Sequence, residues 1–116
     1  MAFVGTRRAD RARAFYRDTL GLKLISEDNF ALAFDVNGTM LRVTLVPHLT
    51  PAAFTVLGWQ VADIAATVGN LQQAGVALER FPGMAQDELG IWTAPGGARV
   101  AWFKDPDGNI LSVTQF

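Results

Sequence analysis

The sequence contains no cysteine and a single histidine, His48, among its 116 residues. Disulfides, thiolate nucleophiles, cysteine metal sites and multi-histidine metal centres are therefore excluded. No apolar run approaches the roughly 20 residues that a membrane span requires. The first residues also lack the apolar stretch of a signal peptide. These absences favour a soluble, cytoplasmic protein without a membrane partner.

An excess of charge of one sign is also missing. The formal net charge is -1, whereas a nucleic-acid-binding surface usually carries a clear basic excess, so we expect no nucleic-acid partner. The chain is instead rich in apolar residues: 50% of its residues are hydrophobic and 18% are charged. That balance favours a folded domain over disorder, and the length fits one domain.

Two segments have the apolar spacing of a helix. They are DRARAFYRDTLG at 10–21 and DIAATVGNLQQAG at 63–75. Each ends in a glycine, Gly21 or Gly75, which adopts the left-handed backbone of a helix end at little cost. Asp63 is placed to cap the second helix.

Alternation of apolar and polar residues predicts strands around both helices. The tight-turn dipeptide Asn37-Gly38 joins two of these strands, and the turn DPDG at 105–108 joins two others. Asp105 and Asp107 are expected to shape the second turn by accepting hydrogen bonds from nearby backbone amides. We expect strands at 30–36, 40–46, 54–61, 98–104 and 109–115.

The sequence contains an internal repeat. Moving the first hairpin forward by 70 positions places Asp35 on Asp105 and Gly38 on Gly108. The order of one strand, one helix and about three strands therefore occurs twice. We predict an α+β fold of two βαβββ modules, which form one curved mixed sheet around a cleft with the helices on its outer face. The modules cover about 1–47 and about 53–116.

The pleat of the strands assigns side chains to two faces of this sheet. The helix-covered face is expected to carry Leu32, Phe34, Leu41, Val43, Leu57, Trp59, Val61, Trp102, Leu111 and Val113. The cleft face is expected to carry Ala31, Ala33, Arg42, Thr44, Val56, Gly58, Gln60, Phe103, Ser112 and Thr114.

Arg42 is the strongest candidate for ligand binding, because a guanidinium group binds carboxylate or phosphate through two hydrogen bonds. The alternatives are that it pairs with an internal acid or extends to the rim. Trp92 either stacks on a planar ligand or packs in the core, and His48 and Glu88 either act in the site or are solvated. No catalytic residue is assigned. The ligand-binding candidates are Arg42, Thr44, Phe54, Gln60, Trp92, Phe103, Ser112, Thr114, His48 and Glu88.

Three segments resemble, in order, the vicinal oxygen chelate superfamily, which includes glyoxalase I, bleomycin-resistance proteins and extradiol dioxygenases. They are RARAFYRDTLGLKL, VADIAATVGNLQQAGV and FKDPDGNILSV. The resemblance implies paired βαβββ modules and often a homodimer. It also implies that metal-dependent members would hold their ion at four positions, none of which carries a suitable ligand here. These positions are Met1, Arg42, Val56 and Ser112.

The sequence therefore favours a small-molecule-binding protein that uses no metal or other cofactor. It would sequester or sense a partly apolar ligand whose anionic group Arg42 holds, and it would form a homodimer. An alternative is a glyoxalase-like lyase or isomerase, or a dioxygenase, whose divalent metal has moved to a site built from His48, Glu88 or Glu27. A further alternative is an interaction domain with a filled cleft. Whether the protein is an enzyme stays open at this point.

Overall fold

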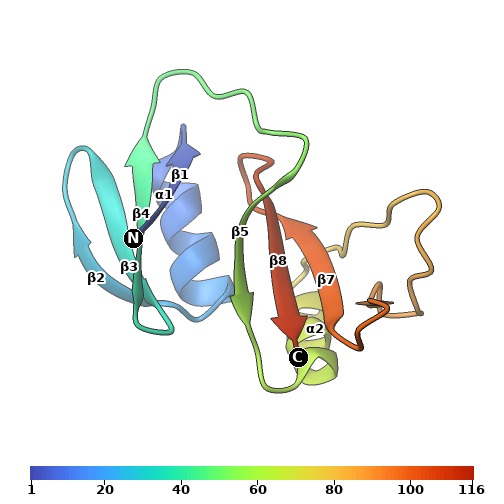
Figure 1. Cartoon of the computed structure of the whole chain (residues 1–116). Helices are drawn as coiled ribbons and strands as arrows, with labels where there is room; N and C mark the ends of the chain where they lie inside the picture. The colour runs from blue at the N-terminus through green and yellow to red at the C-terminus, as the bar shows by residue number, and fades with distance from the viewer.

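The computed structural model describes residues 1–116 as two four-stranded mixed sheets that lie side by side (Figure 1). The first sheet has the order β1-β4-β3-β2 and the second has the order β5-β8-β7-β6. The predicted α+β fold with two βαβββ modules is confirmed. The strands are β1 (Ala2–Thr6), β2 (Lys23–Glu27), β3 (Ala31–Val36), β4 (Thr39–Leu45), β5 (Thr55–Gln60), β6 (Trp92–Thr93), β7 (Arg99–Lys104) and β8 (Ile110–Gln115).

One helical segment belongs to each module. In the first module α1 (Ala9–Arg13) runs directly into a π-helical segment, η1 (Ala14–Thr19). In the second module α2 (Ile64–Gln73) begins where Asp63 Oδ1 accepts a hydrogen bond from the Ala66 N–H at 3.1 Å. The predicted helices are confirmed, although the second half of the first is wound more widely than expected. Neither helix has the length or apolar content needed to cross a membrane.

The two modules repeat in their strand pairing. β1 pairs in parallel with β4, and β5 pairs in parallel with β8. Ala2 lies opposite Leu41 and Leu57 lies opposite Leu111, so the first strands repeat at 55 positions and the hairpins at 70. β1 and β5 are neighbours that run in opposite directions (Figure 1). The modules are therefore related by an approximate twofold axis between these strands.

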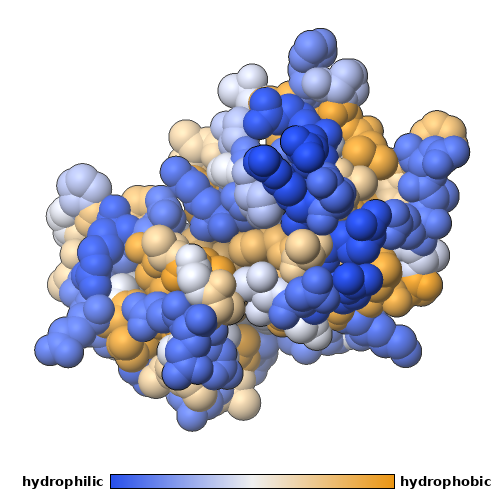
Figure 2. Space-filling model, turned by 180° about the vertical axis from the view of Figure 1, so that it is seen from behind, coloured by the Kyte–Doolittle hydropathy of each residue, from blue (hydrophilic) through white to orange (hydrophobic).

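A single hydrophobic core joins both sheets to the helices. Because every second side chain of a strand points to the same face, one face of each sheet supplies core residues and the other is left open. Seen from behind the view of Figure 1, hydrophilic side chains cover much of the surface, with apolar patches between them (Figure 2). The core includes Tyr16, Leu32, Phe34, Leu41, Val43, Ile64, Val68, Ala101, Phe103, Leu111 and Val113.

The predicted faces of Trp102 and Phe103 are wrong and must be exchanged. Phe103 is fully buried in the core, where its ring lies 6.1 Å from that of Trp59. Phe103 pairs with Leu111, whereas Trp102 pairs with Ser112. Directly paired residues share a face of the sheet. Because Leu111 faces the helices, its partner Phe103 faces them too. Two adjacent aromatic residues gave no hydrophobic contrast by which the pattern could choose between them.

The turn at 105–109 holds the two modules together, beginning with Asp105. Its Oδ1 accepts the backbone N–H groups of Asp107 at 3.0 Å and Asn109 at 2.9 Å, as predicted. Its Oδ2 accepts the Tyr16 hydroxyl at 2.6 Å and the Asn109 amide at 2.8 Å. Tyr16 belongs to η1 of the first module, so one buried carboxylate is hydrogen-bonded from both halves of the chain.

The same turn makes further bonds across the module boundary. Asp107 accepts hydrogen bonds from the Thr6 hydroxyl and from the Arg7 N–H, and Asn109 donates to the Gly5 carbonyl at 2.9 Å. The prediction that Asp107 accepts hydrogen bonds from nearby backbone amides is therefore wrong, because its side chain bonds to the other module instead. We call the bonds from the turn at 105–109 to Gly5, Thr6, Arg7 and Tyr16 the inter-module clamp.

The hairpin turn of the first module makes a single equivalent contact. Asn37 Nδ2 donates to the Gln60 carbonyl at 3.1 Å. Gln60 lies 55 positions after Gly5 and so occupies the same place in its own module. The twofold-related carbonyls of Gly5 and Gln60 each accept an asparagine amide from the opposite module.

Tyr16 is the only tyrosine of the chain, and its titration should report on the clamp. Burial raises the pKa of its phenol, and the charge of Asp105 raises it further. Because the folded-state pKa lies above the unfolded value near 10, this stabilisation is complete below about pH 10 and declines as the pH rises, by about 1.4 kcal/mol per pH unit. We expect no phenolate absorbance at 295 nm until the protein unfolds.

The control is Tyr16→Phe, which removes the titrating group and one partner of a buried carboxylate. It should lower the free energy of unfolding at neutral pH by about 1–3 kcal/mol. A phenolate band with a midpoint near pH 10 in protein that still shows native tryptophan emission would contradict the buried hydrogen bond.

Candidate functional site

The open face is the surface of both sheets that points away from the core, and Arg42 lies on it in the first module. Arg42 is half-buried and pairs with Ala33 on β3 and with Phe3 on β1. Its guanidinium makes no ion pair or hydrogen bond within the chain, since none of the five ion pairs includes it. The backbone N–H groups of Phe30 and Ala31 hold the pKa of Asp28 below its ordinary value, and the charge of Arg42 adds to this.

Ser112 lies on the open face of the second module, at the position that repeats Arg42. It pairs with Trp102 on β7 and with Gly58 on β5. Only 8% of Ser112 is exposed, and a Cβ at position 58 would collide with its hydroxyl. Thr114 follows on the same face, paired with Val100 and Gln60. This half of the face is therefore small, polar and closely packed at its centre.

Three aromatic rings border this second half of the face. The Trp102 ring lies 6.2 Å from the Trp92 ring and 5.4 Å from the Phe81 ring, which meets it edge-on. Trp92 is thus placed against another tryptophan rather than in the main core. Trp102 was absent from the predicted site residues. Symmetric counting across DPDG at 105–108 would set it opposite Leu111, but the strands are joined by five residues, 105–109, which places it opposite Ser112.

The loop between α2 and β6 carries Phe81 to this position. Its conformation depends on Gln86, whose amide donates to the carbonyls of Glu79 and Gly90, both at 2.9 Å. The Gln86 Oε1 also accepts the Phe81 N–H at 2.8 Å. A single side chain therefore makes three of the hydrogen bonds that hold this loop, beside backbone bonds such as that from the Glu79 N–H to the Trp102 carbonyl at 2.8 Å.

The other predicted candidates lie apart from the two halves of the open face. His48 and Phe54 are exposed on the segment that joins the sheets. Glu88 is exposed on the α2–β6 loop, where its carbonyl accepts a hydrogen bond from Arg80, and Glu27 forms an ion pair with Arg13. No group of three His, Asp or Glu side chains with metal-binding geometry is present. Thus His48, Glu88 and Glu27 do not assemble into a metal site within the chain.

Three cavities are present, and none includes Arg42, Thr44, Ser112 or Thr114. The predicted cleft is therefore an open sheet surface in the single chain, rather than an enclosed pocket. Gln60 is the one predicted candidate that lines a cavity, which has a volume of about 340 Å³.

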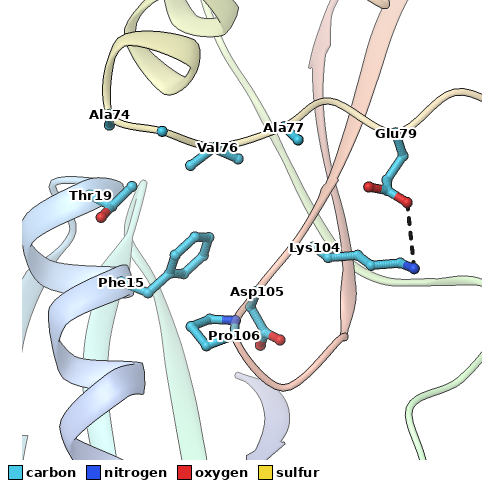
Figure 3. A pocket seen from close by; sticks show the side chains of 10 residues that line it. Phe15, Thr19, Ala74, Val76, Ala77, Glu79, Lys104, Asp105 and Pro106 are labelled. Carbon is cyan, nitrogen blue, oxygen red and sulfur yellow. Dashed lines mark ion pairs between the residues drawn. The ribbon is translucent and has the colours of Figure 1, made fainter.

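A second cavity, of about 320 Å³, lies beside the inter-module clamp (Figure 3). Phe15 of η1 faces Val76 across it, and Asp105 lies near its base. At one side Lys104 forms an ion pair with Glu79 at 3.5 Å. The four acceptor bonds of Asp105 are already made, so its carboxylate has no free capacity for a ligand there.

Comparison with known protein families decides the relationship of this chain. The model of the Glyoxalase/Bleomycin resistance protein/Dioxygenase superfamily matches residues 2–113. The chain belongs to this superfamily. The resemblance inferred from the sequence is thereby confirmed. No curated protein matches the sequence at a significant level.

Solved structures of superfamily proteins share the fold at low sequence identity. A lactoylglutathione lyase from Agrobacterium tumefaciens is 18% identical, with a TM-score of 0.76 over 98% of this chain and 90% of that one. A glyoxalase family protein from Enterococcus faecalis is 17% identical, with a TM-score of 0.73 over 98% and 93%. A glyoxalase/bleomycin resistance protein from Streptomyces sp. CB03234 is 24% identical, with a TM-score of 0.70 over 97% and 96%. At these identities the likeness establishes the fold alone.

The four superfamily metal positions do not fit a divalent ion in this chain. Met1 and Val56 are 55 positions apart and Arg42 and Ser112 are 70 apart, so each pair occupies equivalent places in the two modules. A divalent ion requires carboxylate, imidazole or thiolate donors. Here it would meet two apolar side chains, a buried hydroxyl and a fixed positive charge. These four positions therefore do not form a binding site for a divalent ion.

Proposed function

We propose that this protein binds a small, partly apolar, anionic molecule on its open face, without a metal, and sequesters or senses it. The observation that carries this proposal is the half-buried Arg42 on a sheet surface, with no ion pair or hydrogen bond to the chain. A guanidinium in this position retains its planar set of N–H donors for a carboxylate or phosphate group.

The surroundings of Arg42 support a ligand that is apolar apart from its charged group. Phe3 and Ala33 flank Arg42 on the neighbouring strands. Phe3, on the edge strand β1, is 61% exposed, so a large apolar side chain is open to solvent beside Arg42. Its ring offers a planar surface next to the guanidinium, and Trp92 and Trp102 add aromatic surface in the other module. A planar aromatic carboxylate combines these features.

Binding without chemistry is supported by the side chains available. The superfamily metal positions lack donors, and the lone histidine, the residue best suited to proton transfer near neutral pH, lies on the segment between the sheets. No observation favours a specific reaction. Sequestration or sensing is therefore the simplest role for the open face.

A second copy of the chain would complete this site. The open face forms no enclosed cavity in the single chain, and large apolar side chains lie exposed on it, including Met1, Phe3 and Met40. Pairing two such faces would remove these side chains from water, at a gain of roughly 25 cal/mol for each Å² of apolar surface. We propose a homodimer in which the partner covers the ligand bound at Arg42.

Metal analysis tests the metal-free state. Protein purified without added metal should contain less than roughly 0.1 equivalent of zinc, nickel, manganese or iron by elemental analysis, since the donor set is unsuited to them. Its thermal midpoint should be the same with and without a chelator. Stoichiometric metal that the chelator removes with a loss of stability would contradict the proposal.

Benzoate, a planar aromatic carboxylate, tests the role of Arg42. We expect Arg42→Ala to weaken benzoate binding at least about tenfold by calorimetry or NMR titration, because a charge-assisted hydrogen bond is worth roughly 1.5–3 kcal/mol. Arg42→Lys should restore only part of the affinity, since lysine lacks the planar fork.

The matched control is Arg11→Ala, which removes an exposed arginine of α1 that also takes part in no ion pair. It should leave benzoate binding unchanged. Equal losses in the Arg11 and Arg42 variants would show that only net charge matters, and this would contradict a specific site.

Phe3→Asp tests the proposed dimer. The native protein should sediment as a species of about twice the 12.6 kDa chain, whereas a charge placed at the centre of the open face should yield monomers, because a desolvated unpaired carboxylate is costly. Phe30→Asp, at another strongly exposed phenylalanine in the loop between β2 and β3, is the control and should remain dimeric. A native monomer at high micromolar concentration would refute this arrangement.

A further inference from the structure

The hairpin turn of each module meets the end of the first strand of the other module, which gives two boundaries that are equivalent by the internal repeat. The side chains that occupy these two boundaries differ. At one, the turn at 105–109 bonds to Gly5, Thr6 and Arg7 through the inter-module clamp. The connecting segment also packs there, since a Cβ at Gly108 would lie only 3.2 Å from the Pro51 side chain. This boundary has no room for a ligand between the turn and the end of β1.

At the other boundary, the turn at Asn37 reaches the end of β5 through one hydrogen bond, to the Gln60 carbonyl. The remaining space is the cavity of about 340 Å³. It is distinct from the surface around Arg42 and Ser112, because most of its walls belong to the helix-facing pleat and only Gly58 and Gln60 come from the open-face register. The cavity is lined by Ala2, Val36, Asn37, Thr39, Leu41, Leu57, Gly58, Trp59 and Gln60. We call it the seam cavity.

The lining of the seam cavity contains no ionisable side chain. Its apolar wall combines aliphatic groups with the Trp59 indole, and its polar groups are one hydroxyl and two amides. The Thr39 hydroxyl and the Gln60 amide make no hydrogen bond within the chain, while Asn37 uses only one amide hydrogen. These groups remain free to pair with hydroxyl or amide groups of a ligand.

We infer that the seam cavity is a second binding site, specific for uncharged molecules with an aromatic or aliphatic body and an amide or hydroxyl group. Its volume is at the lower end of the range of small-molecule sites, roughly 300–1,000 Å³. A charged ligand would lose the part of its hydration that faces the apolar wall, with no opposite charge in the lining to replace it. The seam cavity and the Arg42 site therefore select for opposite properties, neutral and anionic.

Benzamide and benzoate, which are nearly the same size but differ in charge, separate the two sites. Titration of ¹⁵N-labelled protein follows the three tryptophan indole N–H signals, assigned by single Trp→Phe variants. Benzamide should shift the Trp59 signal and the side-chain amide signals of Asn37 and Gln60 in a saturable way. Benzoate and benzylamine should act on these signals at least about tenfold more weakly.

Ala2→Leu should fill the seam cavity and weaken benzamide binding at least about tenfold, with the thermal midpoint confirming that the variant folds. Ala53→Leu, on the exposed connecting segment, is the matched control and should bind benzamide normally. Arg42→Ala should also bind benzamide normally, so failure of the Arg42 proposal would not affect this one. Thr39→Val keeps the shape of the lining, removes the hydroxyl and should weaken binding several-fold.

Three results would overturn the inference. The first is the absence of any saturable shift of Trp59 up to about 20 mM benzamide, a concentration that detects even millimolar affinity. The second is an equal response of Trp59 to benzamide, benzoate and benzylamine. The third is a benzamide response confined to Trp92 and Trp102, which would place the ligand on the open face.

Discussion

The docking of the two modules depends on the buried carboxylate of Asp105. A buried charge is costly unless hydrogen bonds replace its hydration. Here four donors do so, and they come from the turn itself and from Tyr16 in the other module. The carboxylate is therefore fully paired only when both halves are in place. This makes the folding of each half conditional on the other, beyond the apolar contacts that they share.

The internal repeat explains both what the modules share and where they differ. Equivalent carbonyls at Gly5 and Gln60 accept asparagine amides from the opposite module, so the duplicated architecture retains one common bond at each boundary. Additional polar bonds have accumulated at one boundary alone. The equivalent positions Arg42 and Ser112 differ in the same way. The first module carries a cation without an ion-pair partner there, and the second carries a closely packed, uncharged side chain.

Most of the fold could be predicted from sequence, because its signals are local. Glycines end both helices, Asn37-Gly38 makes a tight turn, and the repeat establishes the module order. The site could be predicted less well. Choosing between Trp102 and Phe103 required the register across a hairpin, and the reach of Asp107 to Thr6 spans about a hundred positions. Neither the register of Trp102 nor the bond of Asp107 to Thr6 follows from the residues next to them in the sequence. The absence of an enclosed cleft around Arg42 is likewise a property of the assembled sheets.

The outermost strand of the second sheet, β6, is only two residues long. The preceding stretch is held by backbone bonds, by the side chain of Gln86, and by Asp87, which accepts the N–H groups of Leu89 and Ile91. Leu89 and Ile91 of this stretch pack in or against the core, but residues 82–85 do not. Lengthening or shortening the chain at 82–85 would therefore leave the core in place, provided Gln86 and Asp87 keep their contacts. Changes in the length of this segment would therefore alter the surroundings of Trp92 and Trp102 while the scaffold stays constant.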